Sequence, residues 1–151
     1  MPRIVREADV VWEGTISRGA GVVEATSSRA FELPVTIASR VGDPEGKTSP
    51  EELLAAAHAT CYVTSLGGEL ARARTPPERL HVHCTITMDE VPGMGHRIVA
   101  SAIEATGVVP GCDAAAFAQA AETADQGCSF SALIRASATV TIEAHLEQGE
   151  S

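Results

Sequence analysis

Cysteine is the residue type in this chain that is best suited to covalent chemistry. The 151 residues include four cysteines, at positions 61, 84, 112 and 128. No two of them form a C-x-x-C pair, which argues against a structural zinc site. The N-terminal residues lack the apolar stretch of a signal peptide, so we expect a cytoplasmic protein without permanent disulfides. The four thiols are then either inert core residues or reactive groups.

Two of the thiols have ordinary surroundings in the sequence. Cys84 falls on the apolar side of an alternating segment, where a cysteine acts as a small hydrophobic residue. Cys112 lies in the turn 110–113, and nothing around it would lower the pKa of a thiol. We expect neither of them to react.

The other two thiols lie on or beside expected helices. Cys61 lies in the middle of a long helix, where a cysteine on its own is more often a packing residue. Cys128 follows Gly127, which is expected to end a second helix. A helix C-terminus favours cations rather than a thiolate, so Cys128 suits the second of two reacting thiols better than the first. That argument weakens if Cys128 begins a new helical turn.

The elements that must position these residues follow from hydrophobic periodicity and from capping residues. Ser49 can cap the long helix, Pro50 suits its first position, and Glu52 completes a capping box. Asp113 caps the second helix. The expected elements are a strand at 10–16, strands within 22–37 that are interrupted at 26–28 and at Pro34, a helix at 50–74, a hairpin of strands 80–88 and 97–105 with a longish loop, a helix at 114–125 and a strand at 137–146.

Antiparallel connections and two helices predict the α+β class. The length fits a single domain over 1–151, with a frayed tail at 147–151. The formal net charge of −9 repels phosphate backbones, so nucleic acid is excluded as a partner. No run of apolar residues reaches the length of about 18 that a membrane helix needs, so we expect no membrane association.

Four segments of the chain form a pattern when they are taken together. They are WEGTISRGAG at 12–21, TSPEELLAAAHATC at 48–61, VPGCDAAAF at 109–117 and ADQGC at 124–128. In this order they resemble the OsmC/Ohr family of thiol peroxidases over nearly the whole chain. The histidine at position 58 makes the chain resemble the OsmC branch of the family, because the Ohr branch tends to carry tyrosine at this position. The chain departs from that branch at 31–46 and directly after Cys128, which affects the shape expected for the substrate pocket.

The resemblance implies a fold, an activity and a set of site residues. The implied fold is OsmC-like, with antiparallel sheets, a long central helix and an intertwined homodimer whose active sites lie at the subunit interface. The implied activity is reduction of organic hydroperoxides, and more weakly of hydrogen peroxide, without cofactor or metal. Position by position, Cys61 matches the peroxidatic cysteine, Cys128 the resolving cysteine, and Arg18 and Glu51 the active-site arginine and glutamate. A lipoyl protein or a thioredoxin-type dithiol is the implied reductant.

Peroxidase chemistry gives each of these residues a role. The Cys61 thiolate attacks the O–O bond and becomes a sulfenic acid, which Cys128 converts to a disulfide. Arg18 would favour the thiolate and stabilise the departing alkoxide, and Glu51 would orient that guanidinium. Glu51 and Cys61 are ten residues apart on one expected helix, about 15 Å along its axis. We therefore expect Glu51 to serve the site of the other subunit.

Three other functions stay open on the sequence alone. His58 lies three residues before Cys61, which suits a Cys–His hydrolase or acyltransferase, although no oxyanion-hole signature accompanies them. His81 and His83 share a strand face about 7 Å apart, with His145 on another strand, which suits a metal-binding protein without an evident third ligand. The third alternative is a non-enzymatic module that binds a ligand in an apolar pocket of the same fold.

Overall fold

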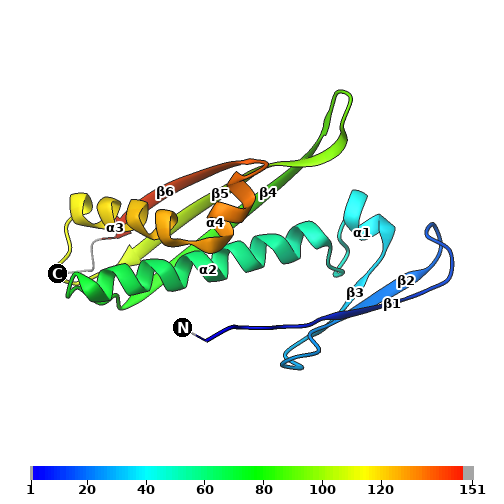
Figure 1. Ribbon diagram of the computed structural model, residues 1–151, viewed down its shortest axis with the longest axis horizontal. Helices are drawn as coiled ribbons and strands as arrows, with labels where there is room; N and C mark the ends of the chain where they lie inside the picture. Colours follow the sequence, from blue (N-terminus) through cyan, green and yellow to red (C-terminus); the bar gives the residue numbers. More distant parts are fainter. Residues whose placement is uncertain (1, 148–151) are drawn as a thin grey trace. The chain divides into compact units, whose positions relative to one another are not determined.

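The structure is a computed structural model that describes residues 2–147. The chain divides into two compact units, with the division between Leu53 and Leu54. The elements of the described chain, labelled in Figure 1, are β1 (Asp9–Glu13), β2 (Ala20–Glu24), β3 (Glu32–Val35), α1 (Ile37–Val41), α2 (Pro50–Arg72), β4 (Arg79–Val91), β5 (Gly95–Val108), α3 (Ala114–Gly127), α4 (Ser129–Arg135) and β6 (Thr139–Glu147).

The first unit contains an antiparallel sheet with the strand order β1-β2-β3. The predicted extension of β1 to Ile16 is wrong, because Gly14 adopts a φ of +91° that turns the chain after Glu13. Pro34 lies inside β3 and does not interrupt it. That position is tolerated because β3 is an edge strand, where a missing N–H costs no ladder hydrogen bond.

Helix α1 is a short element that the sequence prediction assigned to a strand as far as Ile37. It forms because Thr36 and Ser39 make a reciprocal capping box, in which each side chain accepts the other's backbone N–H at 3.0 Å. The buried Ser39 hydroxyl also donates to the carbonyl of Thr48 at 2.8 Å. This bond ties α1 to the residues that precede α2.

Helix α2 confirms the predicted long helix and ends two residues before the predicted boundary. Its cap is the Ser49 hydroxyl, which accepts the Glu52 N–H at 3.2 Å. The predicted capping box is incomplete, because the Glu52 carboxylate accepts a hydrogen bond from the Thr48 hydroxyl at 2.9 Å instead. The predicted cap of α3 is confirmed, since Asp113 accepts the Ala116 N–H at 2.8 Å.

The second unit contains a sheet with the order β4-β5-β6. Strands β4 and β5 form the predicted hairpin, with a turn of only three residues at 92–94. Strands β5 and β6 are parallel, so the expectation of antiparallel connections fails for this pair. The chain crosses over through α3 and α4 before β6, and such a crossover returns a strand in the same direction. The α+β class is confirmed, with a mixed second sheet.

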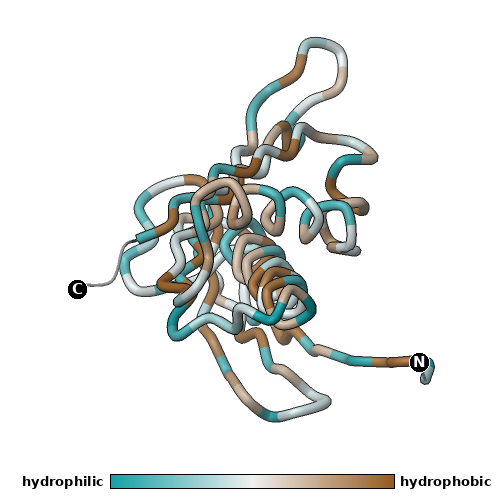
Figure 2. The backbone as a smooth tube through the Cα atoms, turned by 90° about the vertical axis from the view of Figure 1, so that its left-hand side faces the viewer, coloured by the Kyte–Doolittle hydropathy of each residue, from teal (hydrophilic) through white to brown (hydrophobic). Residues whose placement is uncertain are grey.

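Helices cover one face of the second sheet. Figure 1 shows α2, α3 and α4 on the same side of β4, β5 and β6. Alternate side chains on β4 and β6 are half-buried and exposed, as a sheet with one covered face requires. Figure 2 shows hydrophobic and hydrophilic residues alternating around the turns of α2, which is seen nearly end-on. The buried core between these layers includes Tyr62, Leu66, Leu70, Ile103, Ala105, Phe117, Ala121, Ala124 and Cys128.

Strand β6 reaches Glu147, so the prediction of a frayed tail at 147–151 is wrong at its first residue. The other residues of the predicted tail, 148–151, lie outside the described residues. Within residues 2–147, no helix combines the length and the apolar composition needed to cross a membrane.

Candidate active site

The structure brings two of the four thiols together. The Cys128 thiol donates a hydrogen bond to the Cys61 sulfur, and the two sulfurs are 3.3 Å apart although 67 positions separate them in the sequence. Cys61 is half-buried on α2, and Cys128 is fully buried after α3. Both are free thiols. A disulfide needs about 2.05 Å between sulfurs, so a small closing movement is enough to join them.

Cys128 lies at the junction of two helices. It is the C-cap of α3 and at the same time the N-cap of α4, where its sulfur accepts the Ser131 N–H at 3.5 Å. The predicted setting at a helix C-terminus was therefore incomplete. Because α4 begins at once, the backbone N–H groups of Ser129 and Phe130 are free to donate to the Cys61 sulfur.

These hydrogen bonds give the two thiols opposite pKa shifts. Burial raises the pKa of Cys61, but hydrogen bonds from the Phe130 N–H, the Cys128 thiol and Ser129 outweigh burial and lower it. Burial raises the pKa of Cys128, and hydrogen bonds from Ser131 only partly oppose that effect. The arrangement therefore favours a thiolate on Cys61 with the proton on Cys128, which is the ionisation that a nucleophile and its second thiol need.

The remaining two thiols have raised pKa values. Burial raises the pKa of Cys84, whose sulfur lies 3.3 Å from the Ser101 hydroxyl. Burial also raises the pKa of Cys112, and the carboxylate of Asp113 adds to that effect. A raised pKa makes a thiol less reactive at neutral pH, in agreement with the expectation that neither residue reacts.

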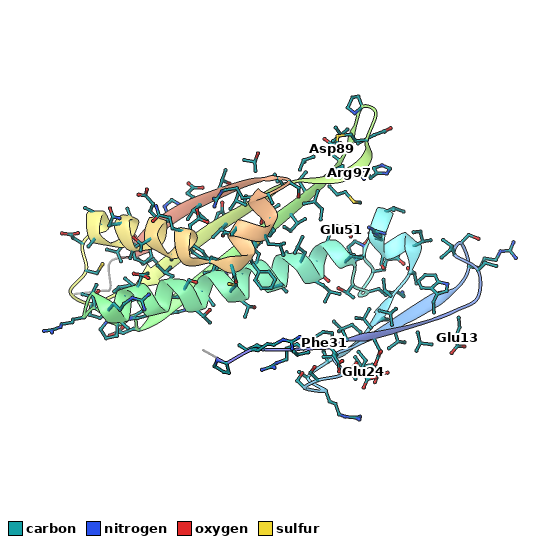
Figure 3. The ribbon with its side chains drawn as sticks, viewed as in Figure 1. Glu13, Glu24, Phe31, Glu51, Asp89 and Arg97 are labelled. Carbon is teal, nitrogen blue, oxygen red and sulfur yellow. The ribbon has the colours of Figure 1, made fainter. Side chains whose placement is uncertain are left out.

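Glu51 lies in the first turn of α2 (Figure 3), where its side chain is 15% exposed. Its Oε1 accepts a hydrogen bond from Nε of Arg40 at 3.0 Å. The bond between Ser39 and Thr48 brings the last turn of α1 to this position. Sequence reasoning missed Arg40, because it placed the residues before it in a strand.

Arg18 lies in the turn between β1 and β2 and is exposed. Its backbone N–H donates to the Thr15 hydroxyl at 3.2 Å. No ion pair within residues 2–147 includes Arg18, so Glu51 does not bind it within this chain. The two predicted charged residues belong to the first unit, and the two thiols belong to the second.

An apolar cavity of about 390 Å³ lies in the first unit. Its polar groups are few, and Arg40 is its one charged lining residue among the residues described. A cavity of this size and character can take the alkyl or aryl part of a small organic molecule. The apolar side chains that line it are Val10, Trp12, Ile16, Val23, Val35, Ile37, Pro50 and Leu53.

His58 does not pair with Cys61. The ring is fully buried, with Nδ1 2.6 Å from the Ser101 hydroxyl and Nε2 2.8 Å from the Ser131 hydroxyl. Burial lowers the pKa of His58, which favours the neutral ring. Both ring nitrogens are thus engaged by serines, with the Cys84 sulfur 3.8 Å from Nδ1. Within residues 2–147, no hydrogen bond joins His58 to Cys61, which is the pair that the hydrolase alternative needs.

The histidines considered for a metal site are exposed and separated. His81 and His83 lie on β4, and His145 lies on β6 beside Glu143, at 3.2 Å. Strand β5 lies between these two strands. In the part of the chain from 2 to 147, no three histidine, cysteine or acidic side chains are grouped so as to hold a metal ion.

Known proteins are similar to this chain in sequence and in fold. The family model described as OsmC-like protein matches residues 42–143. The chain belongs to the OsmC-like family. The peroxiredoxin OsmC of Escherichia coli (strain K12) is 32% identical to this OsmC-like chain over 137 residues, which cover 91% of the chain and 94% of that protein. The family resemblance seen in the sequence is thereby confirmed.

The Ohr branch is represented as well. The organic hydroperoxide resistance protein of Xanthomonas axonopodis pv. citri (strain 306) is 27% identical over 119 residues, covering 78% of the chain and 81% of that protein. The crystal structure of an organic hydroperoxide resistance protein OsmC from Legionella pneumophila superposes with a TM-score of 0.75 at 20% identity, covering 95% of this chain and 99% of that one. The OsmC-like fold is therefore confirmed.

Proposed function

We propose that this OsmC-like protein is a thiol peroxidase that reduces organic hydroperoxides, and hydrogen peroxide less efficiently. The observation that carries the proposal is the 3.3 Å approach of the Cys61 and Cys128 sulfurs, with the pKa of the first lowered and that of the second raised. The names of the two relatives, a peroxiredoxin and an organic hydroperoxide resistance protein, support the same chemistry. The apolar cavity of the first unit suits an organic substrate.

The reaction proceeds in three steps. The Cys61 thiolate attacks one peroxide oxygen, the O–O bond breaks, and the alkoxide takes a proton to leave as an alcohol while Cys61 becomes a sulfenic acid. The Cys128 thiol then attacks the Cys61 sulfur, so that an S–S bond forms and water leaves. An external dithiol, of the lipoyl-protein or thioredoxin type, restores both thiols by exchange. A cytoplasmic location would supply such a dithiol.

Two arginines are candidates for stabilising the thiolate and the departing alkoxide. The resemblance assigns Arg18, whereas the ion pair with Glu51 favours Arg40. Loss of one donor to a developing oxyanion typically costs about a hundredfold or more in rate, so single substitutions to alanine separate them. The arginine whose loss slows consumption of cumene hydroperoxide by that factor is the active-site residue, and a variant with an unchanged rate removes the other from the mechanism.

We propose further that the protein is a homodimer in which Glu51 serves the partner's thiols, because helix rise places it about 15 Å from its own Cys61 along the axis. Mixed dimers test this arrangement. Subunits with Cys61→Ser paired with subunits with Glu51→Ala should retain about one working site of two. Inactive mixed dimers would show that Glu51 acts within its own subunit.

One titration tests the proposed function as a whole. Reduced protein receives one equivalent of cumene hydroperoxide, and its disulfides are mapped by mass spectrometry. A Cys61–Cys128 bond should form within seconds, and a Cys112→Ser variant should behave identically because its thiol takes no part. Cys128→Ser should stop at the sulfenic acid. Unchanged thiols with the peroxide still present would favour the ligand-binding alternative.

A further inference from the structure

His58 joins four elements of the second unit at one buried point. The ring belongs to α2, its Nδ1 lies 2.6 Å from the hydroxyl of Ser101 on β5, and its Nε2 lies 2.8 Å from the hydroxyl of Ser131 on α4. The sulfur of Cys84 on β4 lies 3.8 Å from Nδ1, a longer contact. The ring and the two serines have 0% exposure. A neutral imidazole offers one donor and one acceptor, and a hydroxyl can serve as either, so the three groups satisfy one another without a charge.

Ser131 links this ring to the thiols. Its backbone N–H donates to the Cys128 sulfur at 3.5 Å, and its hydroxyl bonds to His58. Two residues before it, the Ser129 hydroxyl lies 3.8 Å from the Cys61 sulfur. Hydrogen bonds from the backbone of Ser129 and Phe130 contribute to the lowered pKa of Cys61. The segment 129–131 therefore contacts both sulfurs and contacts His58 through the Ser131 side chain.

His58 and Cys61 lie on the same helix, so the ring is fixed relative to the Cys61 sulfur. His58 precedes Cys61 by three residues, so the same helix carries the ring and the sulfur. Because the His58 ring binds the Ser131 hydroxyl, it fixes the position of segment 129–131, and with it the distance from the hydrogen-bond donors of Ser129 and Phe130 to the Cys61 sulfur. Asp125 and Arg135 also act on the ring, with opposite signs and less strongly than burial.

We propose that His58 is a positioning residue that holds Ser131 through Nε2 and so keeps the N–H groups of Ser129 and Phe130 on the Cys61 sulfur. The significance of this role for turnover rests on the proposed peroxidase function. The role itself concerns only the thiols and can be measured without peroxide.

Two conservative variants distinguish the contribution of Nε2 from that of Nδ1. The longer amide of His58→Gln reaches the place of Nε2 and keeps a partner for Ser131, whereas that of His58→Asn reaches only the place of Nδ1 and keeps a partner for Ser101. The thiol pKa of Cys61 is measured from the pH dependence of its alkylation, followed on its own peptide by mass spectrometry. It should stay near the wild-type value in His58→Gln and rise by about one pH unit in His58→Asn, because a hydrogen bond to the thiolate weakens.

Deletion of each serine hydroxyl gives a matched control. Ser131→Ala should raise the thiol pKa of Cys61 as His58→Asn does, and Ser101→Ala should leave it unchanged, as His58→Gln does. Circular dichroism and urea midpoints identify variants that fold, and the serine variants, which remove one oxygen atom each, test the role even if the histidine variants do not fold.

The outcomes distinguish the two proposals. With cumene hydroperoxide, at a pH below both Cys61 pKa values, the disulfide should form about threefold more slowly in His58→Asn than in His58→Gln, because the thiolate fraction falls about tenfold while the thiolate becomes about threefold more nucleophilic. Equal pKa values in all folded variants, or equal rises in Ser131→Ala and Ser101→Ala, would overturn the positioning role. If the wild type leaves the peroxide unconsumed, the peroxidase proposal fails, while the pKa comparison still decides the role of His58.

Discussion

Removing the thiol of Cys128 should raise the pKa of Cys61. The Cys128 thiol donates to the Cys61 sulfur over 3.3 Å, and it is one of four hydrogen bonds that together outweigh the effect of burial. Cys128→Ala removes this donor together with the sulfur that accepts the Ser131 N–H and caps α4. The variant therefore measures the loss of the donor and of the cap together, and Cys128→Ser, whose hydroxyl can keep both, is the comparison.

The size of the effect follows from general magnitudes. A hydrogen bond to a charged group contributes about 1.5–3 kcal/mol, and a thiol is a weak donor, so the lower end of the range applies. That corresponds to about one pKa unit. Below both pKa values the thiolate fraction falls about tenfold, but a thiolate of higher pKa is about threefold more nucleophilic. Alkylation of Cys61 should therefore slow about threefold in that range and accelerate about threefold above both pKa values.

The assay is alkylation of Cys61 by iodoacetamide from about pH 5 to about pH 10, read by mass spectrometry of the Cys61 peptide. Cys128→Ser is the matched control, because its hydroxyl retains a donor and should give a smaller shift. The distinctive outcome is a crossing of the two pH–rate curves. If the Cys128→Ala curve coincides with that of the wild type, the S–H···S hydrogen bond is not what lowers the pKa of Cys61.

Three further predictions concern stability and reactivity in the second unit. Tyr62→Phe removes the hydroxyl that donates to the Ala121 carbonyl at 2.9 Å, and should lower the free energy of unfolding in urea by about 1 kcal/mol. Gly107→Ala places a Cβ 2.8 Å from Cε2 of the buried Phe117, and should cost about 1–3 kcal/mol by the same measurement; an unchanged free energy of unfolding would contradict it. Cys112, whose pKa is raised, should react with iodoacetamide at neutral pH more slowly than a cysteine in an unstructured peptide.

The sequence was sufficient to predict the long helix and the hairpin, and the family resemblance singled out the two cysteines whose sulfurs lie 3.3 Å apart. It did not reveal why the pKa of Cys61 is lowered, because the donors come from the start of α4. That helix has seven residues and is capped by Cys128, a residue type outside the usual N-cap set. Periodicity needs a longer window than such a helix offers.

Two other features were hidden for a similar reason. The helix α1 has only five residues, too few to show an apolar stripe, and it directly follows a strand. Arg40 was therefore not recognised as the partner of Glu51. The two serine partners of His58 lie 43 and 73 positions away, and spacing in a single sequence carries no signal for such contacts. These Ser–His hydrogen bonds depend on the packing of α2 and α4 against the sheet, which periodicity does not describe.

The parallel pairing of β6 with β5 has a consequence for biosynthesis. Cys128 lies in the crossover between these strands, so its place beside Cys61 is secured only when β6 joins the sheet. At a synthesis rate of about 5–20 residues per second, the ribosome needs about 4–17 s to pass from Cys61 to the end of β6. During that interval the Cys61 thiol is without the packed Cys128 beside it, so the hydrogen bonds that lower its pKa are not yet formed.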